Sequence, residues 1–329
     1  MIVVKTPQEI TEAISASCVT IGNFDGVHQG HQKLIRTVVE KAQNLNLTSV
    51  VVTFDPHPLR VLRGGKTPPF ITVTRQKLEL IGALGPDVAL VLEFSKEMAA
   101  MAPEDFVKSF LVDGLRMREL VVGYDYALGR GRSGNLAALQ GLGDKYGYNV
   151  ERLAPVLLGG AVVSSTRIRH LVEAGEVWDV CSLLGRFYQV LGEVVHGHNR
   201  GGRLLGFPTA NLQLVDELFP KPGVYAIWAR TSDGLYKGVA NIGLNPTFGN
   251  DRLSVEAHLL DYSGDLYGTD LLVYFVQRIR DERKFSGLDA LKARIRKDAE
   301  LARRILSVPE AEPHCLTALN KEGGSEAKP

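Results

Sequence analysis

Residues 20–31 read Thr-Ile-Gly-Asn-Phe-Asp-Gly-Val-His-Gln-Gly-His, where an apolar run gives way to a turn and then to a helical pattern. A strand that turns over glycines into a helix leaves backbone N–H groups unpaired at the helix start. These groups and the helix dipole favour anions such as phosphate. His28 and His31 add donors whose charge changes near neutral pH. The pattern indicates a site that handles a nucleotide triphosphate.

The alternation of strands and helices around this stretch predicts a doubly wound α/β domain. Apolar residues at helical spacing run from Leu34 to Leu45, and a buried strand follows at 49–54. Together they complete a strand–helix–strand unit. The alternation continues with helices at 75–84, 103–115 and 167–174 and strands at 88–92, 119–123 and 149–153. We therefore expect residues 1–186 to form a Rossmann-like domain that binds ligands at the carboxyl ends of its strands.

Beyond residue 186 the hydrophobic pattern changes to period two. Short segments rich in Val, Ile and Tyr lie at 190–196, 223–229, 238–242, 254–260 and 271–276. They predict a small antiparallel barrel or sandwich over 187–307 that ends in a helix at 288–306. Residues 308–329 are rich in Glu, Pro, Gly and Ser and predict a disordered tail. The expected fold class is α/β plus all-β.

The composition excludes several classes of protein. The chain carries 38 Lys and Arg against 37 Asp and Glu, a net charge of +1, which gives no basic field for nucleic acid. Cys18, Cys181 and Cys315 lie far apart, which predicts a reducing compartment and no disulfide framework. We find no signal peptide, membrane span or sign of an obligate protein partner. We expect a soluble, cytoplasmic protein.

The histidine pair has alternative interpretations, as a cap or core pair or as half of a metal site. His57 also follows a strand end, but the absence of nearby cysteines and of a histidine cluster disfavours a metal. Two further segments favour phosphate. Residues 123–134 interleave Gly and Arg after a strand, and residues 164–169 place three hydroxyls at a helix start, of which an N-cap explains only one.

Four segments in this order resemble the bacterial bifunctional riboflavin kinase/FMN adenylyltransferase family: GNFDGVHQGH at 22–31, TFDPHP at 53–58, VVGYDYALGRGRSG at 121–134 and SSTRIR at 164–169. The resemblance, which runs from Val19 to Arg303, implies a nucleotidyltransferase domain that transfers AMP from ATP to FMN. It assigns ATP contacts, with catalysis by the two histidines, to Gly22, Phe24, His28, His31, Ser164, Ser165, Thr166 and Arg167. It assigns flavin contacts to Phe54 and Asp125. Tyr126 and Leu128 stand where the family has Phe, which bears on flavin packing.

A second group of residues lies in the β-rich half. Residues 196–211 form a Gly/Arg-rich loop that can wrap phosphates. At its end, Thr209 and Asn211 offer the hard oxygen ligands that Mg²⁺ prefers. In the strand predicted at 254–260, further along the chain, period two places Glu256 and His258 on one face. A glycine-rich turn and a solvated strand face are the plain alternatives.

The motifs GRLLGFPTANL, PKPGVYA, GVANIGLNPTF, SVEAHLLDY and RDERKF resemble the riboflavin kinase module, a small β-barrel. The resemblance assigns Mg²⁺–ATP binding to Gly206, Pro208, Thr209 and Asn211, with Thr209 and Asn211 on the metal. It makes Glu256 the general base. It places Arg280, Glu282 and Phe285 near the flavin. The loop at 196–202 is one residue longer than the family form, so His198, Asn199 and Arg200 are given no roles.

The expected function is therefore FAD synthesis in two steps, from riboflavin to FMN and from FMN to FAD, with ATP as co-substrate and Mg²⁺ as cofactor. Two alternatives remain open. One is a riboflavin kinase or FMN adenylyltransferase with one silent module, and the other is a non-catalytic flavin- or nucleotide-binding regulator. The presence of His28, His31 and Glu256 argues against a regulator, because binding alone needs no base.

Overall fold

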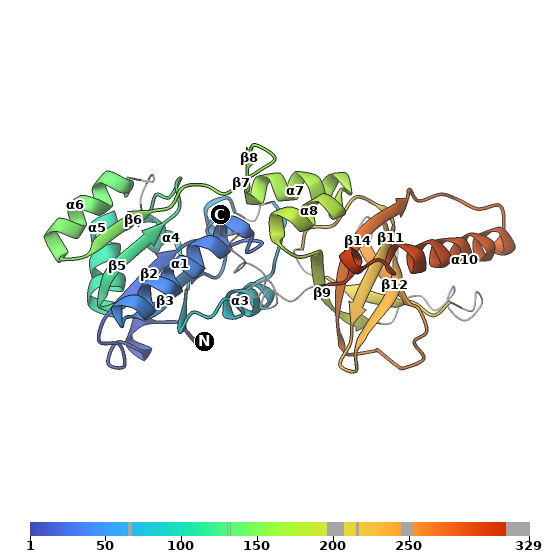
Figure 1. Ribbon diagram of the computed structural model, residues 1–329, viewed down its shortest axis with the longest axis horizontal. Helices are drawn as coiled ribbons and strands as arrows, with labels where there is room; N and C mark the ends of the chain where they lie inside the picture. The colour runs from blue at the N-terminus through green and yellow to red at the C-terminus, as the bar shows by residue number, and fades with distance from the viewer. Residues whose placement is uncertain are drawn as a thin grey trace, which may run out of the picture. The chain divides into compact units, whose positions relative to one another are not determined.

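The computed structural model describes residues 1–64, 68–129, 131, 133–195, 207–214, 217–244 and 253–313. The chain divides into two compact units (Figure 1). The first consists of residues 1–68 and 73–163, and the second of residues 69–72 and 164–329. No helix in the described part of the chain is long and apolar enough to cross a membrane.

The first unit is built on a six-stranded parallel sheet in the order β1-β4-β3-β2-β5-β6. The strands are β1 (Ile2–Val4), β2 (Ser17–Ile21), β3 (Thr48–Phe54), β4 (Val88–Leu92), β5 (Met117–Val122) and β6 (Asn149–Arg152). The central strands β2 to β4 are almost entirely buried, as expected for a parallel sheet covered on both faces. The carboxyl ends of β2, β3 and β5 carry the loops that the sequence singled out.

Helices and turns connect these strands: η1 (Pro7–Glu9), α1 (Gln29–Leu45), α2 (Pro58–Leu62), α3 (Thr74–Gly82), α4 (Lys96–Ala100), α5 (Pro103–Phe106), η2 (Val107–Asp113) and α6 (Leu136–Tyr146). A short hairpin of β7 (Leu157–Leu158) and β8 (Ala161–Val162) follows. The helix expected at 103–115 is thus α5 continued as a π-helix. The patterns above did not predict α6.

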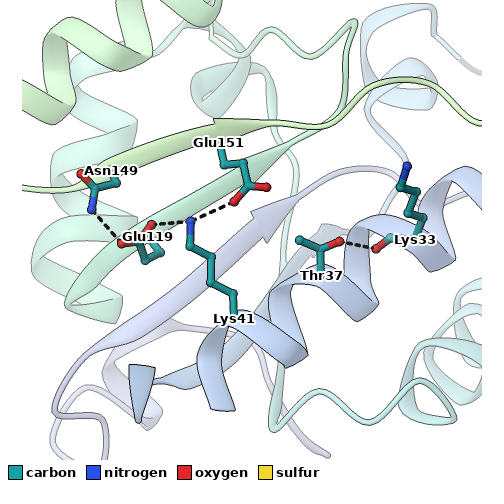
Figure 2. A network of polar contacts seen from close by, with 6 residues as sticks. All are labelled: Lys33, Thr37, Lys41, Glu119, Asn149 and Glu151. Atoms are coloured by element: carbon teal, nitrogen blue, oxygen red, sulfur yellow. Dashed lines mark hydrogen bonds and ion pairs between the residues drawn. The ribbon is translucent and has the colours of Figure 1, made fainter. Parts of the chain in front are cut away.

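An ion-pair network connects helix α1 to strands β5 and β6 of the sheet (Figure 2). The Nζ atom of Lys41 on α1 lies 2.8 Å from Oε2 of Glu119 on β5 and 2.9 Å from Oε2 of Glu151 on β6. Asn149 donates to the other Glu119 oxygen at 2.7 Å. Glu119 is buried, so these contacts compensate the cost of removing its charge from water. The network fixes the helix whose first turn carries the histidine pair.

The second unit is a closed barrel in the order β10-β13-β12-β11-β14-β9, preceded by two helices. Its elements are α7 (Ser165–Ala174), α8 (Val177–Leu184), β9 (Tyr188–Val195), β10 (Ala210–Gln213), β11 (Gly223–Arg230), β12 (Leu235–Leu244), β13 (Leu253–Leu259) and β14 (Asp270–Arg280). All its strand pairs are antiparallel. Closure of the sheet removes its exposed strand edges. Of the two architectures that the sequence predicted, a barrel or a sandwich, the structure has the barrel. The patterns did not predict α8.

The carboxyl-terminal helix α10 (Leu288–Ile305) packs against strands β11, β12 and β14 of the barrel (Figure 1). The chain then forms a 3-10 helix, η5 (Pro309–Ala311). Ala311 is fully buried, and its carbonyl accepts a hydrogen bond from Nε1 of Trp228 at 2.6 Å. Residues 309–311, within the tail expected from residue 308, thus have a defined conformation, and Ala311 joins the apolar cluster that contains Ala302 of α10.

Candidate active sites

The loop after β2 presents two histidines at the start of α1. His28 is the N-cap of the helix, and its Nδ1 accepts a hydrogen bond from the backbone N–H of His31 at 3.3 Å. The two imidazole rings are stacked with their centroids 3.6 Å apart and an interplanar angle of 17°. His28 is buried and His31 is half-buried. The helix start and the two rings therefore form one compact, partly covered patch.

His31 is held in its neutral form. Its Nδ1 atom is buried and has no hydrogen-bond partner among the described residues. Burial lowers the pKa of His31 well below its usual value, and the charges of His28 and Lys77 lower that pKa further. The ring of Phe24 contacts the ring of His31 edge-on at 5.3 Å. At neutral pH this imidazole offers a hydrogen bond rather than a fixed positive charge.

The backbone of this loop is strained. Phe24 (φ 50°) and Val27 (φ 40°) occupy the left-handed region, which is unfavourable for a β-branched residue such as Val27. Nε2 of Gln32 donates to the Val27 carbonyl at 2.9 Å and holds the turn. A Cβ atom at Gly22 would lie 3.0 Å from the ring of Phe24. The structure thus brings Gly22, Phe24, His28 and His31 together, as the sequence predicted.

The next loop, after β3, contains the predicted flavin residue Phe54. Phe54 is half-buried, and its ring contacts that of Phe94 edge-on at 5.5 Å. The peptide bond between Asp55 and Pro56 is cis. His57 caps α2 by accepting from the Leu59 backbone N–H at 3.2 Å. Among the described residues, no three His, Cys, Asp or Glu side chains are grouped to hold a metal.

Lys77 on α3 joins these two loops, and the sequence patterns missed it. Its Nζ atom donates to Oγ1 of Thr53 at 3.1 Å, to the Phe54 carbonyl at 3.2 Å and to the Asn23 carbonyl at 3.3 Å. Lys77 is only 4% exposed. The signal was present, since Lys77 shares the buried face of the predicted helix with Leu80, at a spacing of three. A charged residue on an apolar face indicates a buried polar partner.

The loop after β5 carries the predicted flavin residue Asp125, whose side chain is exposed. Tyr126 packs against the core of the first unit, and burial raises its pKa. Leu128 is buried and forms a bridge with Gly134 that closes the loop. The two departures from the family pattern are therefore residues packed against the core. The arginines at 130 and 132 lie outside the described residues.

The hydroxyl-rich segment begins α7. Ser164 is the N-cap, and its Oγ accepts from the Arg167 backbone N–H at 3.3 Å, as the capping pattern predicted. Ser165, Thr166 and Arg167 occupy the first turn and are half-buried or exposed. These residues belong to the second unit, whereas the histidines belong to the first. Their shared role in binding ATP stays a prediction.

In the barrel, polar residues of three neighbouring strands form one row. Glu256 on β13 lies opposite Asn211 on β10 and opposite Asn241 on β12. Directly opposed residues of antiparallel strands present their side chains on the same face. Val255 and Ala257, on the other face of β13, are fully buried, which is the predicted alternation. The sequence predicted Asn211 and Glu256 but missed Asn241.

Two features of its surroundings affect the pKa of Glu256. Burial raises its pKa, and the negative charge of Glu282 raises that pKa further. Glu282 is held by Asn241, whose Nδ2 donates to its Oε1 at 3.1 Å. A Cβ atom at Gly243 would lie 2.2 Å from the same oxygen, so the carboxylate in this position packs directly against the Gly243 backbone. The structure therefore places Glu282 near the predicted base.

The segment that carries Thr209 is fixed to the same strand. Nδ1 of His258 lies 2.7 Å from the Pro208 carbonyl, and the His258 ring contacts Phe207 edge-on. Thr209 is half-buried, and Asn211 is buried. Pro208 and Thr209 line a cavity of about 220 Å³, whose far wall is formed by residues 262–267. The predicted ATP residue Gly206 and the loop at 196–202 lie outside the described residues.

The three predicted flavin residues of the barrel lie at and after the end of β14. Arg280 directs two guanidinium nitrogens, at 2.8 and 2.7 Å, to Oδ2 of the buried Asp298 on α10. Its guanidinium also lies 5.8 Å from the ring centre of Phe285. Glu282 is exposed, and Phe285 is half-buried. Arg280 thus anchors the segment to α10, and its contact with flavin stays a prediction.

Comparison with known proteins yields matches for both units. The family model of FAD synthetase matches residues 10–167, and that of riboflavin kinase matches residues 184–306. The bifunctional riboflavin kinase/FMN adenylyltransferase of Pseudomonas fluorescens is 40% identical over 89% of this chain and 93% of its own length. That of Escherichia coli K12 is 38% identical, over 91% and 96%. A structure named as a macrolide-efflux protein from Streptococcus pneumoniae is 31% identical, with a TM-score of 0.78 over 92% and 98%.

Proposed function

This chain belongs to the family of bifunctional riboflavin kinase/FMN adenylyltransferases, and we propose on that premise that it makes FAD from riboflavin in two steps. In the barrel, ATP phosphorylates the ribityl 5′-hydroxyl of riboflavin and gives FMN and ADP. In the first unit, the FMN phosphate attacks the α-phosphorus of a second ATP and gives FAD and pyrophosphate. The observation that supports this proposal is that polar residues gather in two separate places: the histidines lie at the start of α1 in the first unit, and the row of Asn211, Glu256 and Asn241 lies in the barrel.

Glu256 is the proposed base of the kinase step. A carboxylate is a stronger base when burial and a second carboxylate raise its pKa, and both effects act on Glu256. It would accept the proton of the ribityl hydroxyl while the oxygen forms a bond to the γ-phosphorus. A positioned base contributes a rate factor of about 10² to 10⁴.

Thr209 and Asn211 fit a site for Mg²⁺–ATP. Their hydroxyl and amide oxygens are hard ligands of the kind that Mg²⁺ prefers. Asn211 lies in register with the proposed base, and Thr209 lines the 220 Å³ cavity. When bound, Mg²⁺ would neutralise charge on the phosphates. On the β13 side this cavity is lined by Ala257 and Leu259, on the strand face opposite to Glu256, so the proposal for the base rests on the register of Asn211 with Glu256.

The adenylyltransferase step needs no base, because the attacking FMN phosphate is already anionic. Its requirement is to position two anions and to neutralise the charge that develops at the α-phosphate. His28 and His31 at the start of α1 are proposed to donate hydrogen bonds to the phosphate oxygens, and the helix dipole would stabilise the negative charge. By the family resemblance, the hydroxyls of Ser164, Ser165 and Thr166 and the guanidinium of Arg167 are also proposed to bind ATP.

The proposed flavin contacts are aromatic or charged groups that remain accessible. In the first unit, Phe54 is half-buried beside Phe94, and Asp125 is exposed on the loop after β5. In the barrel, Glu282 and Phe285 lie just beyond β14. Such rings can stack on the isoalloxazine system, and the carboxylates can accept from its N–H group.

A cytoplasmic location is also proposed. Cys18 and Cys181 are free thiols in the structure. Burial raises the pKa of Cys18 to about 12, so its thiol is unreactive at neutral pH. Free buried thiols are typical of proteins from a reducing compartment.

One incubation tests the two-step proposal. The full chain is mixed with riboflavin, ATP and Mg²⁺, and the flavins are separated by chromatography over time. We expect FMN to appear first and FAD to follow. Accumulation of FMN alone, or conversion of supplied FMN but not of riboflavin, would indicate a single activity. Binding of flavin without turnover in any combination would indicate a regulator.

A further inference from the structure

Lys77 is a buried ammonium group with three oxygen acceptors and no carboxylate among them. The acceptors are the carbonyls of Asn23 and Phe54 and the hydroxyl of Thr53. An ammonium group has three N–H donors, so these contacts use all of them. Lys77 has no donor left for a phosphate or a flavin, and its role is internal.

The acceptors lie on the two loops that carry the proposed substrate contacts. Asn23 follows β2 and precedes the strained turn that leads to His28, and Phe54 ends β3. The Oγ1 atom of Thr53 also lies 3.4 Å from the Asn23 carbonyl. A second contact ties the start of α3 to the β3 loop, because Oγ1 of Thr74 donates to Asp55 at 3.1 Å. One helix thus connects both loops.

Burial of a charged group is energetically costly. The buried Lys77 ammonium group between these two loops therefore needs a structural explanation. The left-handed backbone conformations of Phe24 and Val27 are unfavourable, and such a turn persists only where neighbouring contacts fix it. Gln32 fixes the far end of the turn through the Val27 carbonyl. Lys77 fixes the near end through Asn23.

We infer that Lys77 is a positioning residue for adenylyl transfer: its ammonium group sets the histidine loop and the Phe54 loop at the spacing that brings ATP and FMN together. This inference rests on the proposed function. It gives Lys77 no contact with either substrate. Loss of this connection lets the reacting groups separate, and a misplacement of about 1 Å costs about 100-fold in rate.

A second consequence concerns charge. Burial lowers the pKa of His31, and the electrostatic effects of His28 and of the Lys77 ammonium group lower it further. Burial lowers the pKa of Lys77 itself, and the negative charges of Asp25 and Asp55 partly oppose this shift. Removing the charge of Lys77 therefore raises the pKa of His31, and His31 gains its proton at a higher pH than in the wild type.

The test uses the full chain with Lys77→Met, Lys77→Arg and Thr53→Val. We expect Lys77→Met to lower kcat for FAD formation from supplied FMN by about 10- to 100-fold. Riboflavin phosphorylation in the same preparation is the internal control and should be unchanged. Thr53→Val removes one acceptor at nearly constant volume and should cost less. Lys108→Met, at an exposed pair with Asp113, is the matched control and should leave both activities unchanged.

Two readouts separate positioning from simple support of the fold. Lys77→Arg keeps the charge, so the pH dependence of FAD formation should stay as in the wild type, whereas in Lys77→Met its acidic limb should move to higher pH. The second readout is the riboflavin kinase activity of Lys77→Met, which should stay at the wild-type rate while FAD formation falls. An equal loss of both activities would overturn the inference, as would a folded Lys77→Met protein with wild-type kcat for FAD formation. A wild-type chain that forms no FAD would instead refute the proposed function.

Discussion

At the scale of single residues, the surroundings of Glu256 affect its ability to act as a base. Because burial and Glu282 raise its pKa, its basic form predominates only above the usual range of a glutamate. We expect Glu256→Gln to lower riboflavin phosphorylation by about 10² to 10⁴ and to leave FAD formation from supplied FMN intact. Separate assays of the two steps measure this. Continued phosphorylation in the variant would remove Glu256 from the mechanism.

The same residue predicts a pH dependence. The kinase rate should rise with pH as Glu256 loses its proton. Glu282→Gln removes the negative charge that raises the pKa of Glu256, so the acidic limb of kcat should move to lower pH. The pH at half-maximal kcat is the measurement. A limb that stays in place would show that burial alone sets this pKa.

His31 belongs to the other activity. We expect His31→Ala to lower FAD formation by at least about 100-fold, the scale on which a lost transition-state donor acts, while riboflavin phosphorylation persists. His170, which is exposed on α7, offers a control, and His170→Ala should leave both rates unchanged. Loss of both activities in His31→Ala would contradict separate sites.

At the scale of elements, the network around Lys41 determines how firmly α1 is held (Figure 2). Lys41→Met leaves the buried carboxylate of Glu119 without its cation. We expect the first unit to lose about 1–3 kcal/mol of unfolding free energy, measured by urea denaturation. Arg75→Met, at the exposed pair with Glu79, should cost no more than about 0.5 kcal/mol. Equal losses in the two variants would show that burial of Glu119 contributes nothing.

The elements that the sequence predicted are those with a clear period. Residues 255–259 alternate as expected, and the strand at 88–92 has the predicted bounds. Helix α6 was missed because Gly141 and Gly143 interrupt its pattern. Gly143 is required by packing, since a Cβ atom there would lie 2.5 Å from the Tyr148 carbonyl. A contact of this kind between segments cannot be read from local spacing.

The same distinction applies to the sites. His28, His31 and Glu256 stand in recognisable motifs, and the structure places them at a helix start and on a barrel strand. Lys77 and Asn241 act through partners that are distant in the chain, at separations of 54 and 41 residues. Only the folded chain brings such pairs together. Sequence reasoning therefore finds reacting groups more readily than the residues that position them.

At the scale of the whole molecule, the boundaries of the two units determine which fragments can be used to separate the two activities. We expected the barrel domain to begin at residue 187, whereas the compact second unit also contains α7, α8 and residues 69–72. Helix α8 packs on β9 and β14, and Cys181 on this helix contacts the cluster around Phe187. A chain cut at residue 187 exposes this surface.

Two fragments test where the kinase domain begins. We expect residues 164–329 to fold and phosphorylate riboflavin at the rate of the full chain, without forming FAD. This fragment loses the hydrogen bonds to Pro69 and Phe70, at 3.2 and 2.8 Å, which together contribute about 1–3 kcal/mol. Residues 187–329 also lose α8 and should unfold at a lower temperature. Rates and thermal unfolding of both fragments are the measurements, and a folded but inactive 164–329 fragment would show that the kinase requires the first unit.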